Sequence, residues 1–128
     1  MKILLDTHIL IWAAQNKLPP ELLKYIIDDD NILFFSSAGI WEIAIKYRMR
    51  KEAFSHNPIP LYSGLIDAGY IELPITAKHS FQTVMLPDIH KDPFDRIMVA
   101  QALAEGISFL TSDKIISGYP GSIIYVPK

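Results

Sequence analysis

The sequence contains no cysteine. This absence excludes disulfide bonds, zinc–thiolate sites and thiol catalysis, and it fits a protein of the reducing cytoplasm. Charged residues make up only 20% of the 128 residues, whereas hydrophobic residues make up 50%. Such a chain can bury a substantial core and is not expected to be disordered. We therefore expect one folded domain over residues 1–128.

A long apolar segment is also missing from the start of the chain. Ile3-Leu4-Leu5 is followed directly by Asp6, so this run is too short for a signal peptide or a membrane span. We expect a cytoplasmic protein that does not associate with membranes. The formal net charge of −2 does not indicate nucleic-acid binding. If the four acids of the candidate site are left out, the 12 basic residues outnumber the remaining acidic ones. The net charge therefore does not argue strongly against nucleic-acid binding, but it is no positive evidence for it.

Short apolar runs alternate with helical patterns along the whole chain. This alternation favours an α/β fold in which parallel strands are joined by right-handed crossovers. The clearest helix runs from Asp92 at the N-cap to Gly106 just past its end, with proline at the first helical position. The expected strands cover residues 3–5, 32–35, 70–73, 107–110 and 123–126, and the other expected helices cover 9–14, 20–27, 39–50, 58–68 and 77–86.

Four acidic residues follow strand-like runs or lie in the first turns of helices: Asp6, Glu42, Asp95 and Asp113. In an open parallel sheet, such positions converge on the crevice beyond the carboxyl ends of the strands. Like charges gathered there repel one another unless a divalent cation neutralises them. The pattern therefore predicts a metal site, and through it phosphate chemistry.

Each acid taken alone also has a purely structural explanation. Asp6 and Asp113 would cap a helix or a turn. Glu42 would form an exposed i,i+4 pair with Lys46, worth roughly 0.3–0.5 kcal/mol. Asp95 lies in a first helical turn, where negative charge is favoured. None of these explanations requires all four acids to share one edge of the sheet, so their joint placement favours the metal site.

Hydroxyl and basic residues beside the acids are weaker candidates. Thr7 and Ser112 could hydrogen-bond a phosphate or a metal-bound water, although helix capping explains them equally well. Arg96 could contact phosphate, and an internal salt bridge explains it at least as well. His8 and His90 invite a general-base or zinc interpretation. No second His or Cys accompanies either at ligand spacing, so we expect each histidine either to be structural or to support a metal ligand without binding the metal itself.

Four blocks of sequence carry a family resemblance. In chain order they are Leu4-Leu5-Asp6-Thr7-His8, residues 36–46 (SSAGIWEIAIK), residues 92–102 (DPFDRIMVAQA) and Leu110-Thr111-Ser112-Asp113. Their order and spacing resemble the PIN-domain family and, within it, the VapC-type toxins of bacterial and archaeal toxin–antitoxin pairs. The resemblance covers essentially the whole chain.

The resemblance implies a three-layer α/β/α fold with a central five-stranded parallel sheet. It also implies an endoribonuclease that depends on Mg²⁺ or Mn²⁺, forms a homodimer, and is inhibited by a small antitoxin whose tail enters the acidic groove. The family's small hydroxyl residue falls on Ser112, and its acids fall on the four residues above. We expect Asp6 and Asp95 to be the principal metal ligands, Asp113 to complete the site, and Glu42 to orient the attacking water or a second ion.

Three other functions are considered as alternatives, and one feature of the sequence counts against each of them. A metal-dependent phosphatase with Asp6 as nucleophile usually has a second Asp where His8 stands. A receiver-type signalling domain usually has a lysine after a later strand, and none is clearly placed here. A catalytically silent PIN-like binding module would usually have lost some of the acids.

Overall fold

The centre of the fold is a five-stranded parallel sheet with the strand order β3-β2-β1-β4-β5. A computed structural model describes residues 1–51 and 54–128. The predicted α/β class and the predicted five-stranded parallel sheet are confirmed. The strands are β1 (Lys2–Leu5), β2 (Ile32–Ser36), β3 (Ile71–Leu73), β4 (Ser108–Thr111) and β5 (Ile123–Tyr125).

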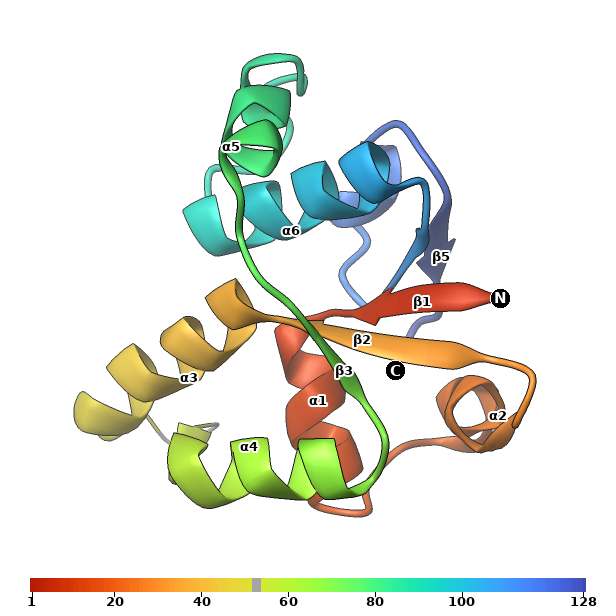
Figure 1. The fold of residues 1–128 in the computed structure, drawn as a ribbon, viewed down its shortest axis with the longest axis vertical. Coiled ribbons are helices and arrows are strands. Elements are labelled where there is room, and N and C mark those ends of the chain that lie inside the picture. Colours follow the sequence, from red (N-terminus) through yellow and green to blue (C-terminus); the bar gives the residue numbers. More distant parts are fainter. Residues whose placement is uncertain (52–53) are drawn as a thin grey trace.

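Helices cover both faces of the sheet. Figure 1 shows α5 and α6 on one side of it and α1, α2 and α4 on the other, which gives the predicted three layers. Within residues 1–51 and 54–128, no helix is long and apolar enough to cross a membrane. The helices are α1 (Thr7–Ala14), α2 (Pro20–Ile27), α3 (Ser37–Arg48), α4 (Pro58–Asp67), α5 (Ala77–Val84) and α6 (Pro93–Glu105).

Successive side chains of β1 point into two different apolar cores. Ile3 and Leu5 pack in the core that includes residues of α1, α2 and α4, whereas Leu4 packs in the core that includes residues of α6. All three side chains are fully buried. A strand with both faces covered has to be apolar without interruption, which explains the run Ile3-Leu4-Leu5 that precedes Asp6.

The caps of α1 and α6 explain where these helices begin and end. Asp6 is the N-cap of α1, so this helix begins two residues earlier than the apolar pattern predicts. Asp92 accepts hydrogen bonds from the backbone N–H groups of Phe94 and Asp95, and the predicted start of α6 is confirmed. Gly106 ends α6 with φ +67°, a left-handed conformation that favours glycine.

A buried polar network fixes the start of α3. Ser36 Oγ accepts a hydrogen bond from the backbone N–H of Ala38 at 3.0 Å and also bonds to Gln101 Oε1. Gln101 Nε2 donates to the backbone carbonyl of Leu73 at 3.1 Å. Because Ser36 and Gln101 are fully buried, this network joins β2, β3 and α6 where no water competes. It holds in place the helix that carries Glu42.

Removing this network should destabilise the fold. We expect Ser36→Ala to lower the free energy of unfolding by about 1–3 kcal/mol, because it removes a helix cap and leaves Gln101 Oε1 buried without its donor. Urea unfolding followed by circular dichroism measures the difference. Ser108→Ala is the matched control, since its hydroxyl belongs to an exposed pair with Ser122, and a change within about 0.5 kcal/mol is expected there. Equal stability of the two variants would contradict the role given to the network.

Candidate metal centre

A cleft of about 500 Å³ lies beyond the carboxyl ends of β1 and β4. The strand order reverses between these two neighbours, because β2 and β3 lie on one side of β1 while β4 and β5 lie on the other. Open α/β sheets bind ligands at such a reversal point. All four predicted acids line this cleft, together with Ser112 and two lysines, and the full lining is Asp6, His8, Trp12, Glu42, Lys46, His90, Asp92, Asp95, Ser112, Asp113, Lys114 and Tyr125.

Asp6 is held in a fixed orientation at the end of the central strand. Its side chain accepts a hydrogen bond from the backbone N–H of Thr7 and another from the hydroxyl of Thr111, each 2.7 Å long. The residue is only 5% exposed. Burial raises the pKa of Asp6, although the hydrogen bonds from Thr111 and Thr7 act in the opposite direction. A buried carboxyl group with two donors is rigid enough to act as a ligand.

Asp95 lies close to several other acids of the cleft. Its side chain lies in the first turn of α6 and is 14% exposed. Burial raises the pKa of Asp95 to about 8, and the negative charges of Asp6, Asp92, Glu42 and Asp113 act in the same direction. The site without a cation therefore favours a proton on Asp95 at neutral pH.

Glu42 is buried, which the sequence pattern did not predict. The expected i,i+4 pair with Lys46 is present at 2.6 Å, but the carboxylate is only 4% exposed. Lys46 bonds to Oε2, while the other oxygen, Oε1, is buried and has no hydrogen-bond partner among the described residues. An unsatisfied buried acceptor costs about 1–3 kcal/mol, so Glu42 Oε1 is suited to a ligand that enters the cleft.

Asp113 and Ser112 lie in the turn that follows β4. Asp113 Oδ1 accepts a hydrogen bond from the backbone N–H of Ile115 at 2.9 Å, which is the turn-forming role considered above. Its Oδ2 is bonded to His90. Ser112 Oγ is buried and, within the described parts of the chain, has no hydrogen-bond partner. Both residues thus present a polar group to the cleft.

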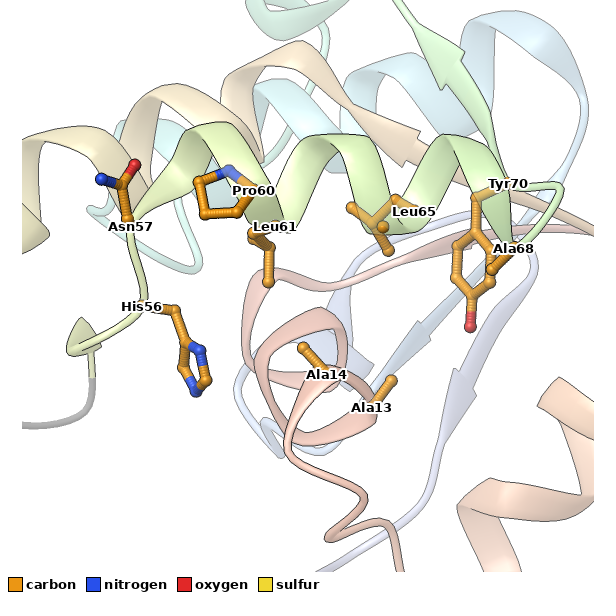
Figure 2. Close-up of a pocket in the computed structure, with 10 residues that line it drawn as sticks. Ala13, Ala14, His56, Asn57, Pro60, Leu61, Leu65, Ala68 and Tyr70 are labelled. Atoms are coloured by element: carbon orange, nitrogen blue, oxygen red, sulfur yellow. The ribbon is translucent and has the colours of Figure 1, made fainter.

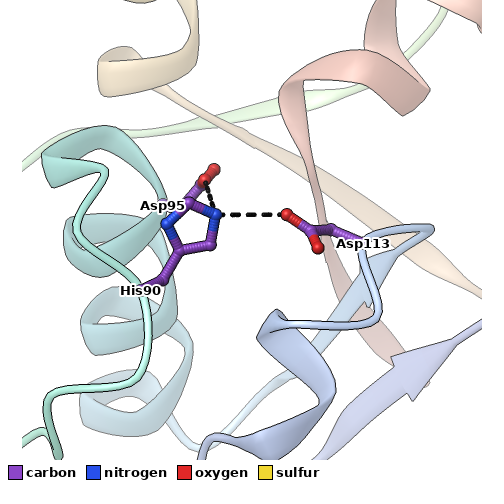
Figure 3. Close-up of side chains that lie close together, drawn as sticks. All are labelled: His90, Asp95 and Asp113. Carbon is purple, nitrogen blue, oxygen red and sulfur yellow. Dashed lines mark hydrogen bonds and ion pairs between the residues drawn. The ribbon is translucent and has the colours of Figure 1, made fainter.

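His90 lies between two of the acids. Its Nε2 atom is 3.3 Å from Asp95 Oδ2 and 3.2 Å from Asp113 Oδ2, and Figure 3 shows the ring beside both carboxyl groups. From the sequence, His90 is not expected to be a metal ligand, because no second His or Cys accompanies it at ligand spacing. One feature of the sequence does indicate that His90 lies near the site. It comes two residues before Asp92, the N-cap of α6, and Asp95 lies in the first turn of that helix.

Two of the weaker candidates have partners elsewhere in the protein. Thr7 is 1% exposed, and its hydroxyl contacts Met98 Sδ at 3.8 Å. The guanidinium of Arg96 donates to the backbone carbonyls of Pro87 and Thr83 at 2.9 and 3.1 Å. Arg96 therefore connects the end of α5 to α6 through carbonyl groups rather than through the salt bridge considered above. Neither residue is among those that line the cleft, so their placement does not support a phosphate contact.

A second hollow, of about 390 Å³, lies between α1 and α4 (Figure 2). Its lining is mainly apolar and, among the described residues, contains no carboxylate: Ala13, Ala14, His56, Asn57, Pro60, Leu61, Gly64, Leu65, Ala68 and Tyr70. The carboxylates that could bind a hard cation are therefore in the acidic cleft and not among the described residues that line this hollow.

The acidic cleft fits a hard divalent cation. Mg²⁺ and similar ions prefer oxygen ligands, and carboxylate oxygens dominate the polar lining. Two buried oxygens, Glu42 Oε1 and Ser112 Oγ, lack hydrogen-bond partners within residues 1–51 and 54–128. Burial raises the pKa of Asp95, and the negative charges of the neighbouring acids raise it further. A cation would relieve both the unmet hydrogen bonding and the repulsion.

Several solved structures with the same fold are toxin–antitoxin complexes. VapBC2 from Rickettsia felis, bound to a DNA fragment from its promoter, aligns with a TM-score of 0.75 at 17% identity over 98% of each chain. DNA-bound VapBC from Salmonella typhimurium aligns with a TM-score of 0.72 at 18% identity over 98% of each chain. A toxin–antitoxin complex from Klebsiella pneumoniae aligns with a TM-score of 0.62 at 17% identity over 95% of each chain. At these identities the likeness establishes the fold, and the VapC-type toxins are the structural neighbours of this chain.

A comparison with curated proteins found no match. A comparison with protein families matched the PIN domain to residues 3–121. This range begins in β1 and ends between β4 and β5, and it contains Asp6, Glu42, Asp95 and Asp113. With the sheet, the acidic cleft and the family match in agreement, the chain belongs to the PIN domain family.

Proposed function

We propose that this chain is a metal-dependent endoribonuclease and the toxin of a toxin–antitoxin pair. The observation that carries the proposal is the convergence of Asp6, Glu42, Asp95 and Asp113 on one cleft at the reversal point of the sheet. Two further findings support it. PIN domains are typically metal-dependent nucleases, and the structural neighbours are toxin–antitoxin complexes.

Asp6 and Asp95 are the residues proposed to hold Mg²⁺ or Mn²⁺, and Asp113 completes the set. When bound, such a cation polarises a phosphate oxygen and lowers the pKa of a coordinated water. Asp6 is suited to this role because Thr7 and Thr111 fix its two oxygens. Asp95 binds a cation only after it loses the proton that its raised pKa favours.

The remaining polar groups of the cleft are proposed to bind the phosphate and to orient the attacking water. Glu42 Oε1 is a buried acceptor that can orient a water, while Lys46 balances the charge on the other oxygen. The Ser112 hydroxyl group is available to donate a hydrogen bond to a phosphate oxygen. Lys46 and Lys114 line the same cleft, so positive charge accompanies the acids where an RNA backbone would lie.

Partners are part of the same proposal. A cleft rich in carboxylates can bind a basic side chain, in agreement with an antitoxin tail that presents an arginine. A homodimer is also proposed, and exposed apolar side chains on and just after α5 support it: Phe81 at 71%, Val84 at 83% and Met85 at 76% exposure. The proposal treats residues 1–128 as one functional domain.

Removing one ligand should abolish RNA cleavage without unfolding the protein. We expect Asp6→Asn and Asp95→Asn each to lower the rate of cleavage of total RNA in Mg²⁺ or Mn²⁺ by at least about 100-fold, because charge stabilisation by the cation is worth several kcal/mol. Chelation with EDTA should have the same effect on the unchanged protein. Circular dichroism checks that the variants are folded.

The matched control for this experiment is Asp67→Asn, an exposed residue at the end of α4 that does not line the cleft. It should cleave RNA at the rate of the unchanged protein. Full cleavage by folded Asp6→Asn and Asp95→Asn would contradict the nuclease proposal, and so would cleavage that persists in EDTA. A phosphatase would instead hydrolyse a phosphomonoester such as p-nitrophenyl phosphate in a metal-dependent manner.

The raised pKa of Asp95 also predicts how stability depends on pH without a cation. The group titrates at 3.8 in an ordinary setting and at about 8 in the folded protein. Between these values the unfolded chain loses a proton that the folded protein retains, so rising pH stabilises the unfolded state. The contribution of Asp95 to stability is therefore complete below about pH 4 and is lost progressively up to about pH 8.

Asp95→Asn should remove this dependence, because its amide does not titrate. In EDTA, we expect the variant to gain stability relative to the unchanged protein as the pH rises from about 5 to about 8. Urea unfolding at the two pH values measures the difference. A constant stability difference between the two proteins across this range would show that Asp95 titrates normally and would contradict the electrostatic description of the cleft.

A further inference from the structure

The hydrogen bonds of His90 define which of its ring nitrogens carries the proton. Nδ1 lies 3.1 Å from the backbone nitrogen of Asp92 and accepts its N–H. A neutral imidazole has one donor nitrogen and one acceptor nitrogen. Because Nδ1 is the acceptor, the hydrogen is on Nε2.

This N–H group faces two carboxyl groups at once. Nε2 is 3.3 Å from Asp95 Oδ2 and 3.2 Å from Asp113 Oδ2, and Figure 3 shows these contacts as dashed lines. The main chain of His90 is also held, since its N–H donates to the hydroxyl oxygen of Tyr119 at 2.8 Å and its carbonyl lies 3.2 Å from the same hydroxyl. The ring is thus fixed on both sides, and its side chain is 21% exposed.

Distance alone would allow His90 to be a metal ligand. Its ring nitrogen and one oxygen each from Asp95 and Asp113 lie within 4.8 Å of one another, which would suit a histidine–carboxylate site. A nitrogen that bears a hydrogen has no lone pair to give to a cation, however. Moving the hydrogen to Nδ1 would set it against the N–H of Asp92 and break that bond.

We propose that His90 is a positioning residue that holds Asp95 and Asp113 together through its Nε2–H and does not bind the metal. This inference rests on the proposed function in taking those two acids as metal ligands. The donor offsets part of the repulsion between the two carboxylates and orients them toward a common point. It also leaves the site with oxygen ligands only, the set that suits Mg²⁺ and Mn²⁺ rather than Zn²⁺. Glu42 Oε1, which is buried in the same cleft and has no hydrogen-bond partner among the described residues, belongs to that oxygen set.

The ring nitrogens can be observed directly by ¹⁵N NMR of histidine-labelled protein at about pH 8.5, where an imidazole is neutral. The spectrum of His90→Gln identifies the His90 resonances by their absence. We expect a proton on Nε2 and an unprotonated Nδ1 in EDTA, and the same state after Mg²⁺ is added. A proton on Nδ1 would overturn the proposal, and so would loss of the Nε2 proton when Mg²⁺ binds, because His90 would then act as a ligand.

Mg²⁺ binding measured by calorimetry tests the positioning role. His90→Phe keeps a ring but has no donor, and we expect its affinity for Mg²⁺ to fall by about 10–100-fold. His90→Gln keeps an N–H donor near the position of Nε2 and should recover most of this loss. Unchanged affinity in His90→Phe, or equal losses in both variants, would overturn the proposal.

Neither measurement uses RNA cleavage, so an inactive but metal-binding protein would count against the nuclease and not against His90. A protein that binds no Mg²⁺ would contradict the proposed metal site, and the NMR result would still decide whether His90 is the donor. Circular dichroism of both variants separates a loss of metal binding from a loss of folding.

Discussion

Repulsion between like charges at the ends of β1 and β4 is the interaction on which this site depends. Burial and neighbouring acids together raise the pKa of Asp95 to about 8. The protein tolerates the cluster by supplying donors: the Thr111 hydroxyl donates to Asp6, and His90 Nε2 is hydrogen-bonded to Asp113 and lies 3.3 Å from Asp95. These donors only partly compensate, because burial and the neighbouring negative charges still favour a proton on Asp95. A bound cation can complete the compensation, which supports the proposed metal site.

The fold creates this repulsion by bringing separate parts of the chain to one edge of the sheet. Asp6 follows the central strand directly, and Asp113 follows its neighbour β4 closely. Asp95 lies in the first turn of α6, which begins at the N-cap Asp92 beside the ends of these strands. The buried network around Ser36 fixes the start of α3, on which the fourth acid lies. The same features that stabilise the fold therefore position the ligands.

Much of this arrangement could be predicted because local signals were strong. The uninterrupted apolar run before Asp6 indicated a strand covered on both faces, and Asp92 with Gly106 marked the two ends of α6. The burial of Glu42 could not be predicted, since an i,i+4 pair with a lysine has the same pattern on an exposed helix. The contacts of His90 could be predicted only in part: its position before Asp92 indicates that it lies near Asp95, but nothing in the sequence indicates its contact with the distant Asp113.

The position of a bound cation decides whether the acidic cleft is the metal site. Anomalous scattering from crystals grown with Mn²⁺ locates the ion without reference to any enzymatic assay. The account predicts an Mn²⁺ ion in the acidic cleft, coordinated by carboxylate oxygens of Asp6 and Asp95 and not by a nitrogen of His90. A well-occupied Mn²⁺ ion in the protein that lies far from Asp6, Glu42, Asp95 and Asp113 would contradict it.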